Sequence, residues 1–145
     1  MKAVIQRVKR TALSVDGKLI SEIPYGLAVY LGVKAGDGEA QAEQIAKKIS
    51  AMRIFEDAQG KMNLSVQDVG GEILLISQFT LYGDCSHGNR PSFILAERPE
   101  RANELYNYVA NLLKRSGLNV KQGVFGADMK IEQFNDGPVT IIYET

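Results

Sequence analysis

The sequence predicts an α/β fold of the α+β kind, in which two amphipathic helices cover a curved or barrel-like mixed sheet. Three observations predict it. Strand patterns fill both ends of the chain, and two segments between them have helical periodicity. A length of 145 residues, of which 45% are hydrophobic, suits one strand-rich domain spanning residues 1–145.

The N-terminal third is predicted to contain three strands. Side chains of Ala3–Val15 alternate between two faces, which is typical of a long strand. The pair Asp16-Gly17 is a strong signal for a two-residue hairpin turn, so Lys18–Ile23 is expected to return beside the first strand. The run Leu27–Val33 is apolar on both faces, as central strands often are.

Two later segments are predicted to be helices. The first follows a loop at residues 34–38, and the second runs from about Pro99 to Ser116, where Gly117 suits the position after a last helical turn. Each has an apolar stripe at helical spacing. The stripes are Ala42, Ile45, Ile49 and Met52 in the first, and Ala102, Leu105, Val109 and Leu112 in the second.

The remaining segments are predicted to be strands. Between the helices, short strands are expected at Met52–Phe55 and Met62–Val66, and a buried strand at Glu72–Leu81. Three more are expected near the C-terminus: Asn119–Val124, Met129–Phe134 and a final buried strand, Val139–Glu144.

The charge balance limits the kind of nucleic-acid contact this chain can make. Seventeen basic residues offset seventeen acidic ones, whereas proteins that grip a long nucleic-acid backbone are usually basic. Any such partner is therefore expected over a small footprint. One local basic patch stands in the first twenty residues, with a solvated strand face as its simpler interpretation: Lys2, Arg7, Lys9, Arg10 and Lys18.

Composition also bounds the location and excludes several kinds of site. No apolar run is long enough to span a membrane, and early charges argue against a secretory signal. A single cysteine, Cys85, excludes an internal disulfide framework, so a cytoplasmic location is expected. Cys85 and the only histidine, His87, share a Gly-rich loop that we expect to be exposed and not catalytic. They are too few to ligate a metal, and we expect no metal or other cofactor.

Two short segments stand out for their chemistry. Ser77, Gln78 and Thr80 place hydrogen-bonding side chains at the end of an apolar run, which indicates either satisfied core structure or a ligand site. Gly137-Pro138 stands before the final strand, where proline is tolerated at a first or edge position. A simple turn is one interpretation. The other is stiff backbone that contacts a ligand, and X-Pro bonds are the ones that become cis.

These two segments, Ser77–Leu81 and Asn135–Thr140, resemble the paired signature motifs of the D-aminoacyl-tRNA deacylases. The segments Met1–Val8 and Gly123–Met129 resemble the same family, so the resemblance spans the chain. It implies an aminoacyl-tRNA editing hydrolase that cleaves the ester of D-aminoacyl-tRNA, rejects L-aminoacyl-tRNA, and releases tRNA and D-amino acid. A filter that works by exclusion would also pass glycyl-tRNA.

The resemblance also implies a homodimer and a set of site residues. Gly137-Pro138 would carry a cis bond and reach into the partner's pocket, with Arg7 holding its backbone in place. The pocket would take the tRNA acceptor end. Its lining would comprise Ser77, Gln78, Phe79 and Thr80, with Phe125 and Met129 as walls for the terminal adenine.

The catalytic route stays open at this point. Either Thr80 is the nucleophile, although no base stands beside it in sequence, or the protein positions water and the tRNA 2′-hydroxyl assists. We favour the second, with backbone N–H groups near Phe79 stabilising the oxyanion. Two other functions compete: an enzyme or binder of small molecules with its pocket at a subunit interface, and a non-catalytic RNA-binding module.

Overall fold

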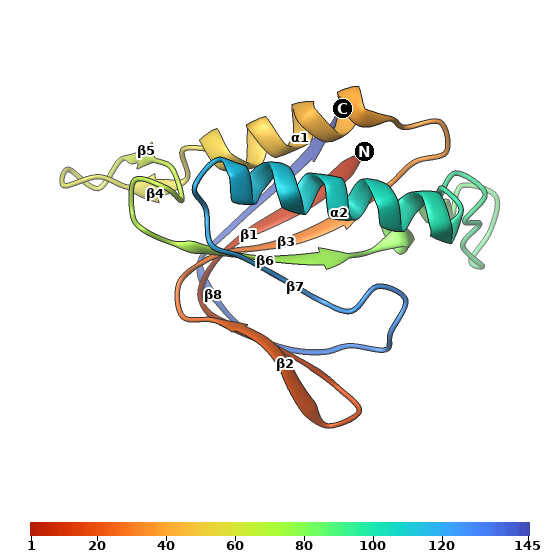
Figure 1. The fold of residues 1–145 in the computed structure, drawn as a ribbon, viewed down its shortest axis with the longest axis horizontal. Helices are drawn as coiled ribbons and strands as arrows, with labels where there is room; N and C mark the ends of the chain where they lie inside the picture. Colours follow the sequence, from red (N-terminus) through yellow and green to blue (C-terminus); the bar gives the residue numbers. More distant parts are fainter.

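The computed structural model describes residues 1–145 and contains a six-stranded sheet, a two-stranded sheet and two α-helices (Figure 1). The strands are β1 (Lys2–Val15), β2 (Lys18–Ile23), β3 (Gly26–Gly32), β4 (Phe55–Glu56), β5 (Met62–Leu64), β6 (Glu72–Ser77), β7 (Val120–Gln122) and β8 (Lys130–Glu144). The helices are α1 (Glu39–Ala51), α2 (Pro99–Arg115) and a 3₁₀ helix, Phe79–Tyr82. No helix is long and apolar enough to cross a membrane.

The large sheet is mixed and strongly curved, as the sequence predicts. Its order is β2-β1-β3-β6-β7, with β8 also pairing β1. Strand β1 runs antiparallel to β2, β3 and β8, whereas β6 is parallel to both β3 and β7. The first half of β1 pairs with β3 and its second half pairs with β2, so the sheet bends along β1 into a partly closed barrel (Figure 1).

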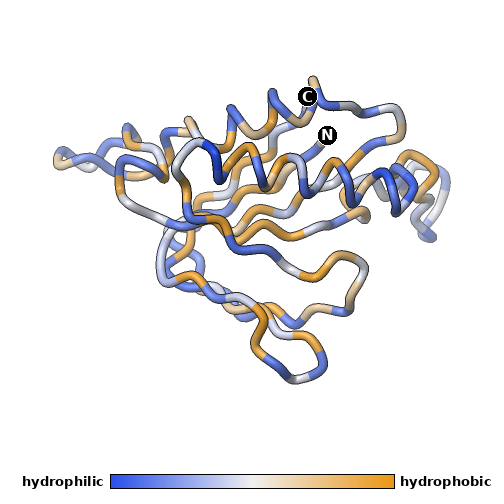
Figure 2. The backbone as a smooth tube through the Cα atoms, viewed as in Figure 1, coloured by the Kyte–Doolittle hydropathy of each residue, from blue (hydrophilic) through white to orange (hydrophobic).

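Hydrophobic residues fill both faces of the curved sheet. Helices α1 and α2 lie side by side over one face, above a cluster of 25 buried residues that includes Ile5, Val29, Ile49 and Val109. A smaller cluster of six, among them Leu13 and Ile76, fills the opposite, concave face. Figure 2 shows hydrophobic colour along the central strands and alternating colour along the helices, as amphipathic elements require.

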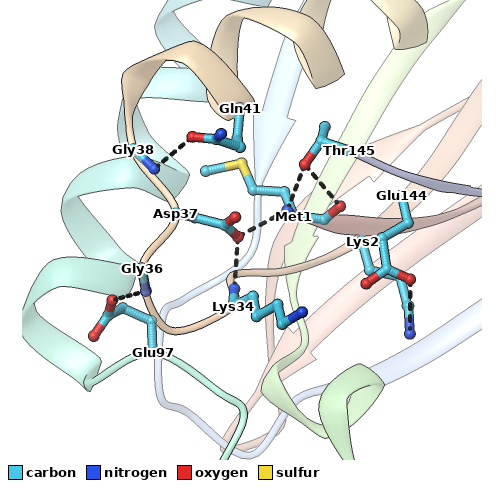
Figure 3. A network of polar contacts seen from close by, with 10 residues as sticks. All are labelled: Met1, Lys2, Lys34, Gly36, Asp37, Gly38, Gln41, Glu97, Glu144 and Thr145. Carbon is cyan, nitrogen blue, oxygen red and sulfur yellow. Dashed lines mark hydrogen bonds and ion pairs between the residues drawn. The ribbon is translucent and has the colours of Figure 1, made fainter.

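The two ends of the chain meet beside α1. The Met1 ammonium group lies 2.7 Å from the Asp37 carboxylate and donates to the Thr145 hydroxyl at 2.7 Å (Figure 3). The Thr145 N–H donates back to the Met1 carbonyl at 3.0 Å. These bonds fix the loop between β3 and α1 against the sheet, and the same loop borders the cavity described below.

The structure corrects the predicted strand Glu72–Leu81. Strand β6 ends at Ser77, and the next residues turn out of the sheet as a 3₁₀ helix. Gln78 ends the pairing, because its N–H donates to Leu31 at 2.9 Å while its carbonyl accepts from Leu81 at 3.3 Å. The two short strands also differ from prediction. The first lies at Phe55–Glu56 and shares only Phe55 with the predicted Met52–Phe55, and the second is shorter, at Met62–Leu64.

The C-terminal strand differs from expectation in two ways. One strand, β8, replaces the predicted pair, and Asn135 and Thr140 flank a bulge in which residues 136–139 oppose Arg7 alone. The prediction that the final strand is buried is wrong. Val139 is its only buried residue, and Ile142 is 68% exposed, because β8 has a neighbour on one side only.

Candidate active site

A cavity of about 670 Å³ opens at the C-terminal ends of β3 and β6. These strands are parallel, and the region beyond the carboxyl ends of parallel strands is where ligands commonly bind in α/β sheets. The 3₁₀ helix, the start of α2 and the loop between β7 and β8 complete the wall. Ten of its 17 lining residues are hydrophobic, which suits an organic ligand held by a few polar groups.

The cavity brings together five of the site residues named from the sequence. They come from two segments that are far apart in the chain, one at the end of β6 and one before β8. The five are Ser77, Gln78, Phe79, Phe125 and Met129.

The turn after β6 places Gln78 and Phe79 in the wall of the cavity. Because the Leu81 N–H makes the first 3₁₀ hydrogen bond, the N–H groups of Phe79 and Thr80 precede it and have no partner within the helix. The Phe79 ring is 55% exposed and packs edge-on against Phe93, with ring centroids 5.1 Å apart. The turn therefore presents unused donors beside an aromatic wall.

Thr80 lies beside the cavity and does not line it. Its side chain is exposed, and its hydroxyl accepts a hydrogen bond from the Gln78 side-chain amide. No imidazole or carboxylate hydrogen-bonds to it, so the structure holds no base that would activate this hydroxyl.

Phe125 and Met129 are held by packing from behind. Phe125 faces Tyr106, with centroids 6.1 Å apart, and the buried Tyr106 hydroxyl donates to the Leu75 carbonyl at 2.7 Å. Burial raises the pKa of Tyr106 to about 12, which keeps this donor neutral and protonated. A Cβ on Gly123 would lie 2.7 Å from the Met129 sulfur, so glycine there allows Met129 to pack closely.

A charged rim at the start of α2 is the part of the site that sequence reasoning missed. Glu97 accepts from the Arg98 N–H at 2.8 Å. It also accepts from the Gly36 N–H at 3.1 Å (Figure 3). These two backbone bonds lower the pKa of the Glu97 carboxyl. Arg98 forms no ion pair, whereas Asp128 across the rim pairs with Lys130 at 2.8 Å. The sequence held one signal for this rim, the predicted helix start at Pro99. Residues just before a helix start stand at its N-terminal end, which here borders the cavity.

The Gly137-Pro138 bond is cis, as the resemblance to the deacylases implies. Within one chain this step does not line the cavity. It lies on the bulge opposite Arg7, which pairs with Leu27 near the start of β3, whereas the cavity lies past Leu31 at the other end of that strand. The step is exposed at the surface.

Arg7 ties down the backbone that precedes this step. Its side chain is buried, and Nε donates to the Asp136 carbonyl at 3.3 Å and approaches the Asp136 carboxylate at 3.1 Å. A terminal nitrogen of the same guanidinium donates to the Ile54 carbonyl at 2.9 Å. Gly137 itself has φ +122°, and a Cβ there would meet Val139 at 2.8 Å. Only glycine fits this position without a shift.

The remaining chemical candidates lie apart from the cavity. Cys85 and His87 are both exposed, as expected for their loop. No group of three or more His, Cys, Asp or Glu side chains is arranged to hold a metal ion.

Known proteins match this chain over its whole length. Two curated relatives carry the name D-aminoacyl-tRNA deacylase. That of Carboxydothermus hydrogenoformans is 51% identical over 144 residues, covering 99% of each chain. That of Geotalea daltonii is 53% identical over 145 residues, covering 100% of this chain and 97% of its own.

Two solved structures share the fold. One, described as c-Myc DNA Unwinding Element Binding Protein, superposes with a TM-score of 0.93 at 43% identity and covers 100% of this chain and 99% of its own. A second, of a probable eukaryotic D-amino acid tRNA deacylase, has a TM-score of 0.82 at 15% identity, covers 98% and 97%, and supports the fold alone. The sequence model described as D-Tyr-tRNA(Tyr) deacylase matches residues 4–144, and this chain therefore belongs to that family.

Proposed function

We propose that this chain hydrolyses the ester of D-aminoacyl-tRNA and of glycyl-tRNA, releases free tRNA and amino acid, and rejects L-aminoacyl-tRNA. The observation that carries the proposal is the cavity in which the Ser77–Phe79 turn faces Phe125 and Met129. It offers donors for an ester and apolar walls for a base, in a chain of the D-Tyr-tRNA(Tyr) deacylase family. Phe125 and Met129 would hold the terminal adenine.

A homodimer would complete the site. Gly137-Pro138 lies away from its own cavity and is exposed, so it is free to enter the cavity of a partner. The outer side of β8 also carries exposed apolar side chains, Phe134 and Ile142, which a partner subunit would cover. In this arrangement Arg7 is a positioning residue, because it holds the backbone before the step and touches no substrate.

The proposed chemistry is attack of water on the ester carbonyl carbon. The carbonyl oxygen becomes an oxyanion that accepts from the N–H groups of Phe79 and Thr80, which have no partner within the 3₁₀ helix. The bond to the ribose oxygen then breaks, and that oxygen leaves with a proton. The neighbouring 2′-hydroxyl of the tRNA accepts a proton from the attacking water and passes its own proton to that oxygen. No imidazole or carboxylate hydrogen-bonds to Thr80, so its hydroxyl has no base that would make it the nucleophile.

The handedness of the amino acid would be recognised by backbone atoms of the partner subunit. An L side chain would point at the wall made by Gly137 and Pro138 of the partner, whereas a D side chain would point away. Hydrogen bonds from Arg7 hold this wall, so it cannot move aside as a free side chain does. Glycine has no side chain to exclude and would therefore pass.

In this proposal residues 1–145 act as one domain, since β1 and β8 from the two ends of the chain pair along their length. The site of action would be the cytoplasm, where charged tRNA is used. Comparing hydrolysis of D-tyrosyl-tRNA with that of D-tyrosine ethyl ester tests the substrate class. We expect the tRNA ester to be the far better substrate. Cleavage of the small ester alone would contradict the proposal and indicate an enzyme for small molecules.

A further inference from the structure

Most basic residues of the N-terminal strand are engaged in ion pairs, so the unpaired positive charges of the chain lie mainly on other elements. The basic patch seen in the sequence is largely neutralised, because four of its members pair with carboxylates: Lys2, Arg7, Lys9 and Arg10. Of the five residues in this patch, only Lys18, at the tip of the β1–β2 hairpin, forms no ion pair. Most of the cations that are free to bind nucleic-acid phosphates therefore lie elsewhere on the molecule.

A cationic groove lies between the C-terminal half of α1 and the end of β8. It has a volume of about 550 Å³, and none of its seven lining residues is acidic. Three are cations: Lys47, Lys48 and Arg53. None of the three forms an ion pair, in a chain whose seventeen basic residues are matched by seventeen acidic ones. The groove is thus a local concentration of free positive charge.

Neighbouring residues hold two of these cations, Lys48 and Arg53, in place. The Lys48 ammonium lies 5.4 Å from the centre of the Tyr143 ring, and the Tyr143 hydroxyl accepts from the Gln44 amide at 3.0 Å. Arg53 donates from Nε to the Asn63 carbonyl at 2.7 Å. Such contacts reduce the side-chain freedom that a ligand would otherwise have to restrict.

The groove is linked to the Gly137-Pro138 step of its own chain. Arg53 directly precedes Ile54, whose carbonyl accepts from Arg7, and Arg7 also holds Asp136. Through Arg7, one wall of the groove and the Gly137-Pro138 step are therefore tied to each other. We propose that the groove binds backbone phosphates of the tRNA acceptor arm, an inference that rests on the proposed function.

The residues of the groove suit phosphate better than bases. Lysine binds phosphate as a point charge without reading a base edge, so contacts of this kind position a nucleic acid without specifying its sequence. Three cations also form a small footprint, consistent with a chain that has no net charge. The groove would therefore raise affinity for every tRNA alike.

The test compares three charge reversals on exposed lysines: Lys47→Glu and Lys48→Glu in the groove, and Lys18→Glu on the hairpin as the matched control. The affinity for uncharged tRNA is measured by fluorescence anisotropy over a series of salt concentrations. We expect each groove variant to weaken binding about tenfold at low salt and to reduce the slope of log K against log salt by about one. Lys18→Glu should match the wild type.

Hydrolysis separates this inference from the proposed function. The groove variants should lose kcat/KM on D-tyrosyl-tRNA but cleave the D-tyrosyl ester of adenosine, which has no phosphate, as fast as the wild type. Unchanged tRNA affinity and salt slope in both groove variants would overturn the inference while wild-type hydrolysis stands. The lipid phosphates of an anionic membrane are the competing ligand, so binding to phosphatidylserine vesicles is measured as well. Groove variants that lose vesicle binding but keep tRNA binding would also overturn the inference. Absence of D-tyrosyl-tRNA hydrolysis in the wild type would instead contradict the function.

Discussion

Arg7 donates from Nε to the carbonyl of Asp136 at 3.3 Å, one residue before the Gly137-Pro138 step. The same guanidinium donates to the Ile54 carbonyl at 2.9 Å, so one buried side chain fixes two separate backbone segments. Lysine keeps the charge but lacks the fork that makes both bonds. A bond to a charged group contributes about 1.5–3 kcal/mol, so Arg7→Lys should lower both stability and activity.

We expect Arg7→Lys to fold with a reduced melting temperature and to lose about tenfold or more in kcat/KM on D-tyrosyl-tRNA, since 1.4 kcal/mol corresponds to a factor of about ten. Lys9→Ala is the control, because Lys9 also reaches the Asp136 carboxylate, at 3.4 Å, but from a side chain that is 71% exposed. Wild-type activity in Arg7→Lys would mean that Asp136 needs only a nearby positive charge.

Gly137→Ala should damage the site directly. The added Cβ would lie 2.8 Å from both the backbone nitrogen and a methyl group of Val139, at a φ of +122° that side chains rarely adopt. Strain of about 1–3 kcal/mol and displacement of the wall should follow, and a shift near 1 Å can cost about a hundredfold in rate.

The matched control is Gly60→Ala, which also has positive φ but meets no atom within 4 Å and lies in the β4–β5 turn. Circular dichroism should show both variants folded. Wild-type turnover of D-tyrosyl-tRNA by Gly137→Ala would remove this residue from the site.

Glycyl-tRNA tests how handedness is read. A wall that rejects L side chains by collision offers nothing to reject in glycine, so glycyl-tRNA should be deacylated well above the background rate. The measurement is release of labelled glycine from glycyl-tRNA with and without enzyme. Complete resistance would indicate that a D side chain must make a positive contact.

Thr80→Ala separates the two catalytic routes. Thr80 is exposed and its hydroxyl hydrogen-bonds only to Gln78, so we expect single-turnover rates within about threefold of the wild type, whereas removing a true nucleophile costs on the order of 10⁶. A collapse of that size would restore Thr80 as the nucleophile. The complementary substrate ends in 2′-deoxyadenosine, and undiminished cleavage of it would rule out help from the 2′-hydroxyl.

Local chemistry made much of the fold predictable. Asp16 and Gly17 form the turn between β1 and β2, because this dipeptide tolerates positive φ at both positions. Strand β2 then spans the predicted residues, Lys18–Ile23. Helix α2 starts at the predicted Pro99 and ends one residue before the predicted Ser116. These signals depend on neighbours in sequence and need no knowledge of the tertiary structure.

Features set by distant contacts were not predictable. The end of β6 depends on the bond from Gln78 to Leu31, 47 residues earlier in the chain. Glu97 and Arg98 reach the cavity because α2 starts at the edge where β3 and β6 end. The exposure of β8 depends on what lies beside it, and its apolar sequence gives no information about that neighbour.

The central claim is that this site hydrolyses esters of one handedness, and a single comparison tests it most directly. The same tRNA is charged with D-tyrosine or with L-tyrosine, and deacylation is followed at equal enzyme concentration. We expect rapid release of D-tyrosine and no release of L-tyrosine above the uncatalysed rate. Comparable rates for the two would contradict the account.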